Sequence, residues 1–364
     1  MKTIKALNKN HCTGCGACVN ACRAKSISMK ADAEGFFYPS INPDLCSGCS
    51  LCYSVCPALN SQKPDENHAA VKIYAAWSLD NEVRYNSTSG GIFTELAKTV
   101  IKNGGCAVGA KYNANHLVEH ILIDKIDDIY LLRQSKYVQS ETNGIFKKAE
   151  IELQKGRQVL FSGTPCQCGG MMHYLQKEYK NLILCDFICR GVNSPLVYLK
   201  YLNELEEKYN ARVKQVWFKN KTNGWNRFGT KIIFDDGQEY FKSRDDDPFM
   251  RGYIKNGLNL YMRPSCGICM FKGVDRPVDI TLGDFWGMKT DPDYGVSMVM
   301  LHSAKGGDFF EKIKANIHSE QSRIEDILPY NRCLYEAAKP RKTRNNFWMD
   351  IRHKSFMQSI EYYI

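Results

Sequence analysis

Two runs of four cysteines near the start of the chain constrain its fold more than any other feature. Both follow the spacing C-x2-C-x2-C-x3-C, and their first members, Cys12 and Cys46, are 34 residues apart. Three closely spaced thiols on one loop supply three ligands to a [4Fe-4S] cluster, and the fourth cysteine of such a run completes a neighbouring cluster. The spacing therefore predicts a small module whose backbone turns tightly around two [4Fe-4S] clusters.

The same spacing is the signature of bacterial two-cluster ferredoxins, which also predicts the grouping of the ligands. The two expected sets are Cys12, Cys15, Cys18 and Cys56, and Cys46, Cys49, Cys52 and Cys22. Zinc is the alternative, but structural zinc sites use paired C-x2-C knuckles rather than triplets with a trailing cysteine. Arg23 departs from the pattern, since it stands where the second run has Pro57. Residues 27–41 predict a hairpin with its turn at 33–35, as in a ferredoxin module.

Composition describes an intracellular globular protein with a redox function. The chain has 364 residues, of which 44% are hydrophobic and 24% charged, values typical of a soluble protein. No apolar run approaches the roughly 18 residues of a membrane span, and no secretory signal precedes the first cysteine. We therefore expect a cytoplasmic location. In that compartment the 16 cysteines indicate metal ligation or redox chemistry rather than disulfides.

The formal net charge of +10 does not predict nucleic-acid binding. That value counts cysteines as neutral, whereas ligating thiols are deprotonated, so two clusters lower it to about +6 and three to about +4. The remaining basic residues gather late, in residues 339–354. This segment is interpreted either as a solvated helix face and tail or as a docking patch for an acidic electron carrier.

Beyond the second cysteine run, strand and helix signals alternate. We expect a ferredoxin domain over 1–62, a polar linker over 63–70, an α/β domain over 71–330 and a basic C-terminal helix or tail over 331–364. Strands are predicted at 71–78, 106–112, 116–123, 158–163 and 182–187. Helices are predicted at 86–105, near 141–155, through 171–179 and from Pro195, with Ser194 as its cap. This alternation favours a parallel or mixed sheet.

Three glycine-rich turns are expected to converge at the carboxyl ends of these strands, where α/β sheets bind ligands. The turns are 87–91, 162–170 and 189–194. None is a G-x-G-x-x-G fingerprint, so nicotinamide binding is only weakly indicated. Ser89-Gly90-Gly91 could receive a phosphate at a helix start, although most such caps bind nothing.

A third cysteine set is spread over three segments of the larger domain. Cys166 and Cys189 follow two predicted strands, and Cys266 and Cys269 form a C-x2-C pair. The four thiols could meet at a third metal site, or they could be buried inert cysteines.

Several long motifs, in order, resemble the beta-subunit family of the hydrogenases and dehydrogenases that use coenzyme F420. Plant 7-hydroxymethyl chlorophyll a reductase and ferredoxin-dependent divinyl reductases are similar to this family. The motifs are STSGGIFTELAK (87–98), SKYVQS (135–140), FSGTPCQ (161–167), DFICRGVNSP (186–195), the cluster Gly224, Trp225 and Phe228, PSCGICMF (264–271) and DITLGDFWG (279–287). The resemblance covers the N-terminal module and residues 71 to about 320.

The resemblance implies a flavin, FAD, beside a third [4Fe-4S] cluster held by Cys166, Cys189, Cys266 and Cys269. It implies flavin contacts at Ser87, Ser89, Gly90, Gly91, Lys136, Tyr137, Thr164, Gly283 and Asp284. The cysteines left unligated are Cys106, Cys168, Cys185 and Cys333. The expected fold is an α+β, ferredoxin-like module with two [4Fe-4S] clusters, fused to an α/β flavin-binding domain with a parallel or mixed sheet.

Clusters carry single electrons and flavins carry one or two, so a chain with both links the two kinds of carrier. We expect electrons to pass from an acidic ferredoxin, or a similar carrier, through the clusters and flavin to a small molecule. Candidate proton donors are Asp284, Asp186 and His173.

Other functions remain open. The chain could oxidise or reduce coenzyme F420, or serve as a non-catalytic electron-transfer subunit. Disulfide reduction at Cys166 and Cys168 is a further alternative. Expected partners include a redox subunit or a second copy of the chain, but neither nucleic acid nor a membrane span.

Overall fold

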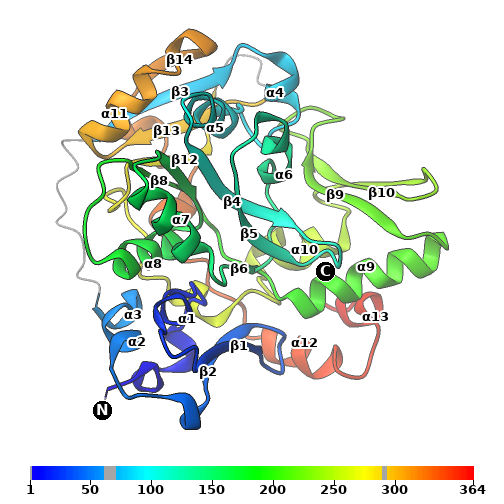
Figure 1. Cartoon of the computed structure of the whole chain (residues 1–364). Helices are drawn as coiled ribbons and strands as arrows, with labels where there is room; N and C mark the ends of the chain where they lie inside the picture. Colours follow the sequence, from blue (N-terminus) through cyan, green and yellow to red (C-terminus); the bar gives the residue numbers. More distant parts are fainter. Residues whose placement is uncertain (1, 61–70, 289–292) are drawn as a thin grey trace.

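A nine-stranded mixed sheet forms the centre of the molecule (Figure 1). The computed structural model describes residues 2–60, 71–288 and 293–364. In spatial order the strands are β14 (Ile317–Ser322), β3 (Lys72–Ser78), β13 (Ser297–Leu301), β12 (Ile280–Asp284), β8 (Leu182–Phe187), β7 (Val159–Ser162), β4 (Cys106–Tyr112), β5 (Val118–Ile123) and β6 (Ser140–Glu141). The central strands β12, β8, β7 and β4 are mutually parallel, whereas β13, β3 and β14 add an antiparallel flank. A mixed α/β sheet is thus present, as expected.

Helices cover both faces of this sheet because its central strands alternate apolar side chains between the two faces. Leu160 and Ile183 pack on one side with α5 (Ile92–Lys102), α6 (Ile129–Leu132) and α11 (Ala304–Glu311). Phe161 and Leu184 pack on the other side with α7 (Ile145–Gln154) and α8 (Pro165–Leu175). The carboxyl ends of β7, β8 and β12 lie side by side and carry the loops of the candidate site.

Two helix starts differ from the sequence prediction. The helix expected over 86–105 begins only at Ile92, because Gly91 adopts a left-handed φ of +89° and ends the preceding loop. The helix expected through 171–179 begins earlier, at Pro165, and ends at Leu175. Thr164 and Gln167 form a capping box at its start, so Cys166 and Cys168 lie in a helical turn rather than in a glycine-rich loop.

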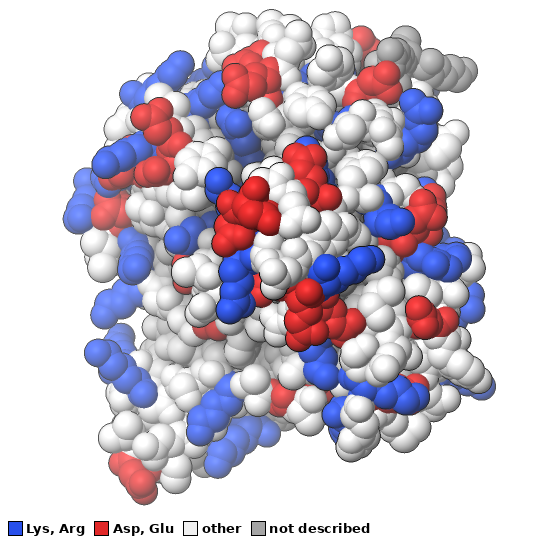
Figure 2. All heavy atoms as spheres, turned by 90° about the vertical axis from the view of Figure 1, so that its right-hand side faces the viewer, with Lys and Arg blue, Asp and Glu red and all other residues white. Residues whose placement is uncertain are grey.

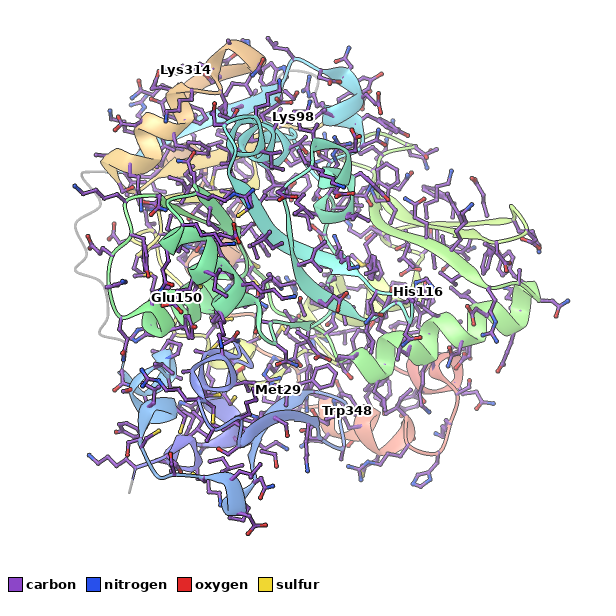
Figure 3. All side chains as sticks on the ribbon, viewed as in Figure 1. Met29, Lys98, His116, Glu150, Lys314 and Trp348 are labelled. Atoms are coloured by element: carbon purple, nitrogen blue, oxygen red, sulfur yellow. The ribbon has the colours of Figure 1, made fainter. Side chains whose placement is uncertain are left out.

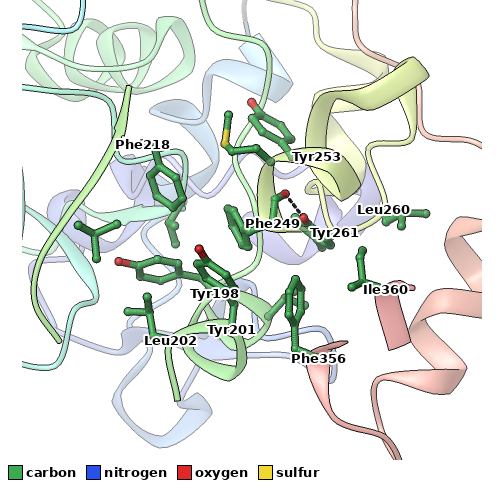
Figure 4. Close-up of a cluster of buried hydrophobic side chains, with 14 of the residues drawn as sticks. Tyr198, Tyr201, Leu202, Phe218, Phe249, Tyr253, Leu260, Tyr261, Phe356 and Ile360 are labelled. Atoms are coloured by element: carbon green, nitrogen blue, oxygen red, sulfur yellow. Dashed lines mark hydrogen bonds between the residues drawn. The ribbon is translucent and has the colours of Figure 1, made fainter. Parts of the chain in front are cut away.

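A second, smaller sheet carries the aromatic core of the molecule. It consists of β9 (Val213–Asn220), β10 (Gly229–Phe234) and β11 (Glu239–Ser243), all antiparallel. Helices α9 (Pro195–Tyr209) and α10 (Pro248–Ile254) pack beside it, and Ser194 caps α9 as predicted. Phe249 lies at the centre of the cluster, which Figure 4 shows from close by.

The C-terminal segment is not the solvated tail that its charge suggested. Its helices α12 (Arg344–Asp350) and α13 (Phe356–Ile360) bury Phe347, Trp348 and Phe356 in the aromatic core. Arg344 forms an ion pair with Glu34 of the N-terminal hairpin. Figure 3 labels Trp348 on α12 beside that hairpin. Apolar side chains at helical spacing therefore outweigh the basic composition of this segment.

The N-terminal module packs against the helices α7 and α8, which cover one face of the large sheet. It contains α1 (Ala17–Ala21), α2 (Leu51–Ser54), α3 (Pro57–Asn60) and the antiparallel hairpin of β1 (Ile27–Ala31) and β2 (Phe37–Ile41). Helix α1 lies on α8, where Gly170 leaves room for Cys15 (Figure 1). The predicted linker, 63–70, lies outside the described residues. Among the described residues, no helix is long and apolar enough to cross a lipid bilayer.

Candidate functional site

The cysteines of the module form two sets, here called the outer set and the middle set. The middle set is Cys12, Cys15, Cys18 and Cys56, which all line one small cavity. Burial raises the pKa of Cys15 to about 12, and the nearby Cys56 and Cys12 thiols add to that rise. The backbone N–H of Ala17 points at the Cys15 sulfur, a contact of the kind that tunes cluster potentials. Crowded, buried thiols hold their protons until a metal displaces them.

The outer set lies at the surface of the module. Cys52 is within electrostatic range of the other three members, Cys22, Cys49 and Cys46. Cys49 is exposed, and its pKa is lowered by the backbone N–H of Leu51, with a smaller contribution from Arg23. The structure therefore assembles the two crossed sets that the ferredoxin rule predicts, with Cys22 and Cys56 exchanged between them.

Four further cysteines converge where α8, β8 and the 3-10 helix η7 (Pro264–Ile268) meet. This inner set, Cys166, Cys189, Cys266 and Cys269, lines a second small cavity. Burial raises the pKa of Cys266 to about 12 and raises that of Cys189 well above its usual value. Thr164 Oγ1 lies 3.1 Å from Cys166 Sγ. The three segments thus bring together the four thiols that the resemblance assigned to one cluster.

The arrangement of these thiols bears on the kind of metal site that they could form. Within the described residues, no three His, Cys, Asp or Glu side chains converge closely enough to bind one metal ion. A four-iron cluster places each thiolate on a different iron, so its ligands stand farther apart than those around a single zinc ion. The C-x2-C-x2-C-x3-C spacing of the two runs in the N-terminal module is the pattern that supplies such ligands.

The three cavities of the site follow one another and share walls. Thr13 and Gly14 line the cavities of both the middle and the inner set. Cys189 and Thr164 line both the inner-set cavity and a much larger one of about 690 Å³. Cys52 of the outer set lies within electrostatic range of Cys18 in the middle set. The order is therefore outer set, middle set, inner set and large cavity.

The large cavity collects most residues for which a flavin contact was predicted. Ser87, Ser89, Gly91, Lys136, Tyr137, Thr164, Gly283 and Asp284 line it. Gly90 is the exception among the nine, since it packs against β3 and β13 and its N–H donates to Ser297 Oγ. A Cβ at Gly90 would lie 2.4 Å from the Ala76 carbonyl oxygen, so its glycine is explained by packing.

A loop over residues 133–137 forms one wall of the cavity and holds a buried lysine. Gln134 and Tyr137 have positive φ, and the N–H of Ser135 donates to Thr88 Oγ1. Lys136 Nζ donates to the carbonyls of Arg133 and Gln134. Burial alone lowers the pKa of Lys136 to about 7. A buried amine of this kind suits an anionic ligand.

The three predicted proton donors differ in their surroundings. Asp186 borders the cavity but is held by Arg276 at 3.0 Å and by the hydroxyl of Thr281. Asp284 also borders it, with Oδ2 2.7 Å from Lys219 Nζ and a buried Oδ1 that has no hydrogen-bond partner among the residues that the structure describes. His173 is half-buried on α8 and is not part of the cavity wall. Of the three, only Asp284 offers an unsatisfied atom there.

Several cavity residues were not predicted from the sequence. Lys219, at the end of β9, lies 4.8 Å from the Phe228 ring and 4.9 Å from the Trp286 ring. Further basic side chains on the wall that were not predicted as site residues are His120, Arg133, Arg190, Arg244 and Arg332. The motif around Trp225 and Phe228 was an available signal for this wall, but nothing in β9 marks Lys219 as a site residue. Six Lys and Arg residues against Asp186 and Asp284 make the wall electropositive.

The remaining cysteines do not form a redox pair. Cys106, Cys168 and Cys185 are fully buried, and Cys333 borders the large cavity. Cys168 Sγ points to the carbonyls of Gly163 and Cys185, while Cys166 faces the inner set. Side chains two residues apart on a helix do not face each other, which argues against disulfide chemistry at Cys166 and Cys168.

Comparisons with known proteins give the family. Models described as coenzyme F420 hydrogenase/dehydrogenase, beta subunit, match residues 73–147 with the N-terminal part and 156–327 with the C-terminal part. A 4Fe-4S dicluster domain matches residues 11–60. None of the curated proteins matches the chain.

Among solved structures, one chain of the F420-reducing [NiFe] hydrogenase complex from Methanosarcina barkeri is 16% identical, with a TM-score of 0.49 over 72% of this chain and 86% of that one. The family models, by contrast, cover most of the large sheet and the loops of the cavity. The chain belongs to the coenzyme F420 hydrogenase/dehydrogenase beta-subunit family and carries an iron–sulfur dicluster module at its N-terminus.

Proposed function

We propose that the chain is an iron–sulfur flavoprotein oxidoreductase. It takes single electrons from a ferredoxin through three [4Fe-4S] clusters and delivers them to FAD in the large cavity, where a small molecule is reduced. The observation that carries this proposal is the wall formed by Cys189 and Thr164, which separates the inner cysteine set from the cavity. A cofactor in the cavity would lie against a cluster ligand, which suits electron transfer.

The residues of the cavity fit a flavin nucleotide. Its volume of about 690 Å³ falls within the range of cofactor sites. The electropositive wall suits a diphosphate, and Lys136 in particular has no carboxylate among its hydrogen-bond partners. When bound, FAD would supply the step between single electrons and a two-electron substrate.

Protein groups around the cavity would position the substrate and supply its proton. Lys219 and Asp284 form a hydrogen-bonded pair on the wall formed by β9 and β12. Burial lowers the pKa of Lys219, while Asp284 opposes that shift. The pair therefore holds a proton at the cavity surface, whereas Asp186 is occupied by Arg276.

The outer cysteine set offers an entry point for electrons. Cys49 is exposed, and Leu45 beside this set is also exposed. Arg23 is near Cys49, Lys2 lies over the Tyr53 ring, and Lys5 is exposed on the neighbouring turn. On the face shown in Figure 2, Asp and Glu lie among Lys and Arg over the centre and top, while Lys and Arg predominate toward the lower left. We assign acidic ferredoxin to the outer-set surface, defined by Lys2, Lys5, Arg23, Leu45 and Cys49.

Cofactor analysis of anaerobically purified protein tests the proposal. We expect a flavin absorbance spectrum, FAD on release, and about twelve iron atoms per chain, the total for three four-iron clusters. Serine at Cys166 should lower the iron content by about four atoms and leave the module clusters in place. Absence of flavin, or about eight iron atoms in the unmodified protein, would contradict the proposal.

Coenzyme F420 is a second candidate substrate, favoured by the description of the family to which the chain belongs. An anaerobic assay with coenzyme F420 and a dye acceptor distinguishes it from other small molecules. Turnover would identify it as a substrate, and no turnover by flavin-replete protein would exclude it.

A further inference from the structure

A buried arginine lies at the junction between the middle and the inner cysteine sets. Arg263 is 0% exposed and directly precedes η7, which carries Cys266. Its Nε donates to the carbonyl oxygen of Cys12 at 2.9 Å, so the side chain reaches the middle set. Its own carbonyl accepts from the N–H of Cys266, so its backbone belongs to the inner set. One residue thus contacts ligand segments of both sets.

The guanidinium of Arg263 has no acidic partner in the described parts of the chain. Nη1 donates to the amide oxygen of Gln139 at 3.0 Å, and Nη2 is buried with no hydrogen-bond partner in the described part of the chain. Tyr38 stacks its ring 4.1 Å from the guanidinium carbon. A buried charge needs an opposite charge nearby, because hydrogen bonds to neutral groups do not replace its hydration.

The wall between the two sets is shaped around this side chain. Gly14 has φ of +71°, and a Cβ there would lie 3.1 Å from the Arg263 guanidinium carbon and 2.5 Å from Gln139 Nε2. Gly14 and Gln139 both line the inner-set cavity, and Gly14 also lines the middle-set cavity. The guanidinium therefore lies directly behind the wall that the two sites share.

We propose that Arg263 is the shared counter-cation of the middle and inner clusters and raises the reduction potentials of both relative to the outer cluster. Each cluster with four thiolates is anionic and gains a further negative charge on reduction. A fixed positive charge between them stabilises the reduced forms. Arg263 would affect electron transfer only through the potentials of these two clusters, so it is a positioning residue and not a catalytic one. The inference rests on the proposed clusters but not on the flavin or the substrate.

An EPR-monitored redox titration of the anaerobically purified full chain tests this role. Arg263→Gln should lower the midpoint potentials of two clusters and leave the third unchanged. Arg263→Lys keeps the charge and should keep both potentials close to those of the parent. Arg23→Gln, which removes a cation near Cys49, identifies the outer cluster as the one that it shifts. Arg212→Gln, at an exposed position, should shift none.

A second variant covers the case in which Arg263→Gln loses iron. Gln139→Glu places a carboxylate against Nη1 and neutralises the arginine without removing it, so the same two potentials should fall. The proposal is overturned if iron-replete Arg263→Gln or Gln139→Glu leaves both potentials unchanged, or if all three shift equally. Failure of the proposed function is recognised separately. An iron content below that of three clusters shows that the inner cluster is missing, and a missing flavin absorbance shows that no flavin is bound.

Discussion

At the scale of single residues, the cavity contains charged groups that are buried without a full set of polar partners among the described residues. Within the described residues, Lys136 Nζ donates to two backbone carbonyls and lies 5.7 Å from the centre of the Tyr112 ring, and burial lowers its pKa to about 7. Because its pKa in the unfolded chain is near 10.5, the unfolded state binds the proton more tightly. Burial of Lys136 therefore destabilises the fold most below pH 7, and this penalty fades as the pH rises toward 10.5.

Replacement of Lys136 by Met tests this linkage. The free energy of unfolding of the variant, relative to the parent, should fall by about 2 kcal/mol between pH 7 and pH 9, since the penalty it relieves becomes smaller. Urea unfolding of cofactor-free protein at both pH values measures the change. Lys155→Met, at an exposed site, should show no such trend, and a pH-independent difference for Lys136→Met would contradict the assignment.

At the scale of elements, contact between α1 and α8 brings the middle set close to the inner set. Gly170 is the point of closest approach, because a Cβ there would lie 3.1 Å from both Cβ and Sγ of Cys15. Gly307 on α11 is also helical, but a Cβ there would have no neighbour within 4 Å. The two helical glycines therefore differ in what packs on them, Cys15 on Gly170 and nothing within 4 Å of a Cβ at Gly307.

Alanine at these two positions should have opposite effects. Gly307→Ala should raise the free energy of unfolding by roughly 0.5–1 kcal/mol through helix propensity alone. Gly170→Ala gains the same propensity but displaces Cys15, so it should lower stability and change the EPR signal of the middle cluster. Anaerobic thermal unfolding and EPR spectra compare them. Equal stabilisation by both would show that α1 does not pack closely on α8.

At the scale of the whole molecule, the cysteine sets run from an exposed end to the large cavity. Electrons from a large carrier can enter only where a cluster lies near the surface, and Cys49 is the exposed member of the outer set. Residues 339–342 provide an alternative basic surface, since Pro340 packs on Gly267 between Cys266 and Cys269. Charge complementarity would steer an acidic ferredoxin to one of these two surfaces.

Charge reversal distinguishes the two surfaces. Lys5→Glu with Arg23→Glu should slow reduction by an acidic ferredoxin about tenfold or more at low salt and weaken its salt dependence. Lys339→Glu with Lys342→Glu, the matched control, should leave the rate near that of the parent. Stopped-flow mixing measures the reduction rate of both double variants. Reduction by dithionite, a small molecule that does not dock as a protein does, checks that their clusters are intact. If Lys339→Glu with Lys342→Glu slows the reduction by ferredoxin instead, docking occurs at residues 339–342.

Sequence alone determined the local features whose signal lies in adjacent residues. The cysteine spacing indicated the crossed sets, because cluster ligation imposes fixed loop lengths. Apolar runs located β4 and β8 at their observed bounds. Ser194 and Pro195 marked the start of α9, since caps are read from neighbouring positions. The motifs of the larger domain pointed to its family in the same way.

Only the tertiary structure decided which distant segments meet. Lys219, Asp284 and Trp286 come from separate strands and loops, and their contact depends on how the small sheet packs beside the large one. Arg263 likewise has no local signal in the sequence. Its side chain is placed by hydrogen bonds to Cys12 and Gln139, which are 251 and 124 residues away. The C-terminal segment joined the core because its apolar faces found the aromatic cluster. Long-range burial, which sequence spacing does not encode, sets the charge environment of the site.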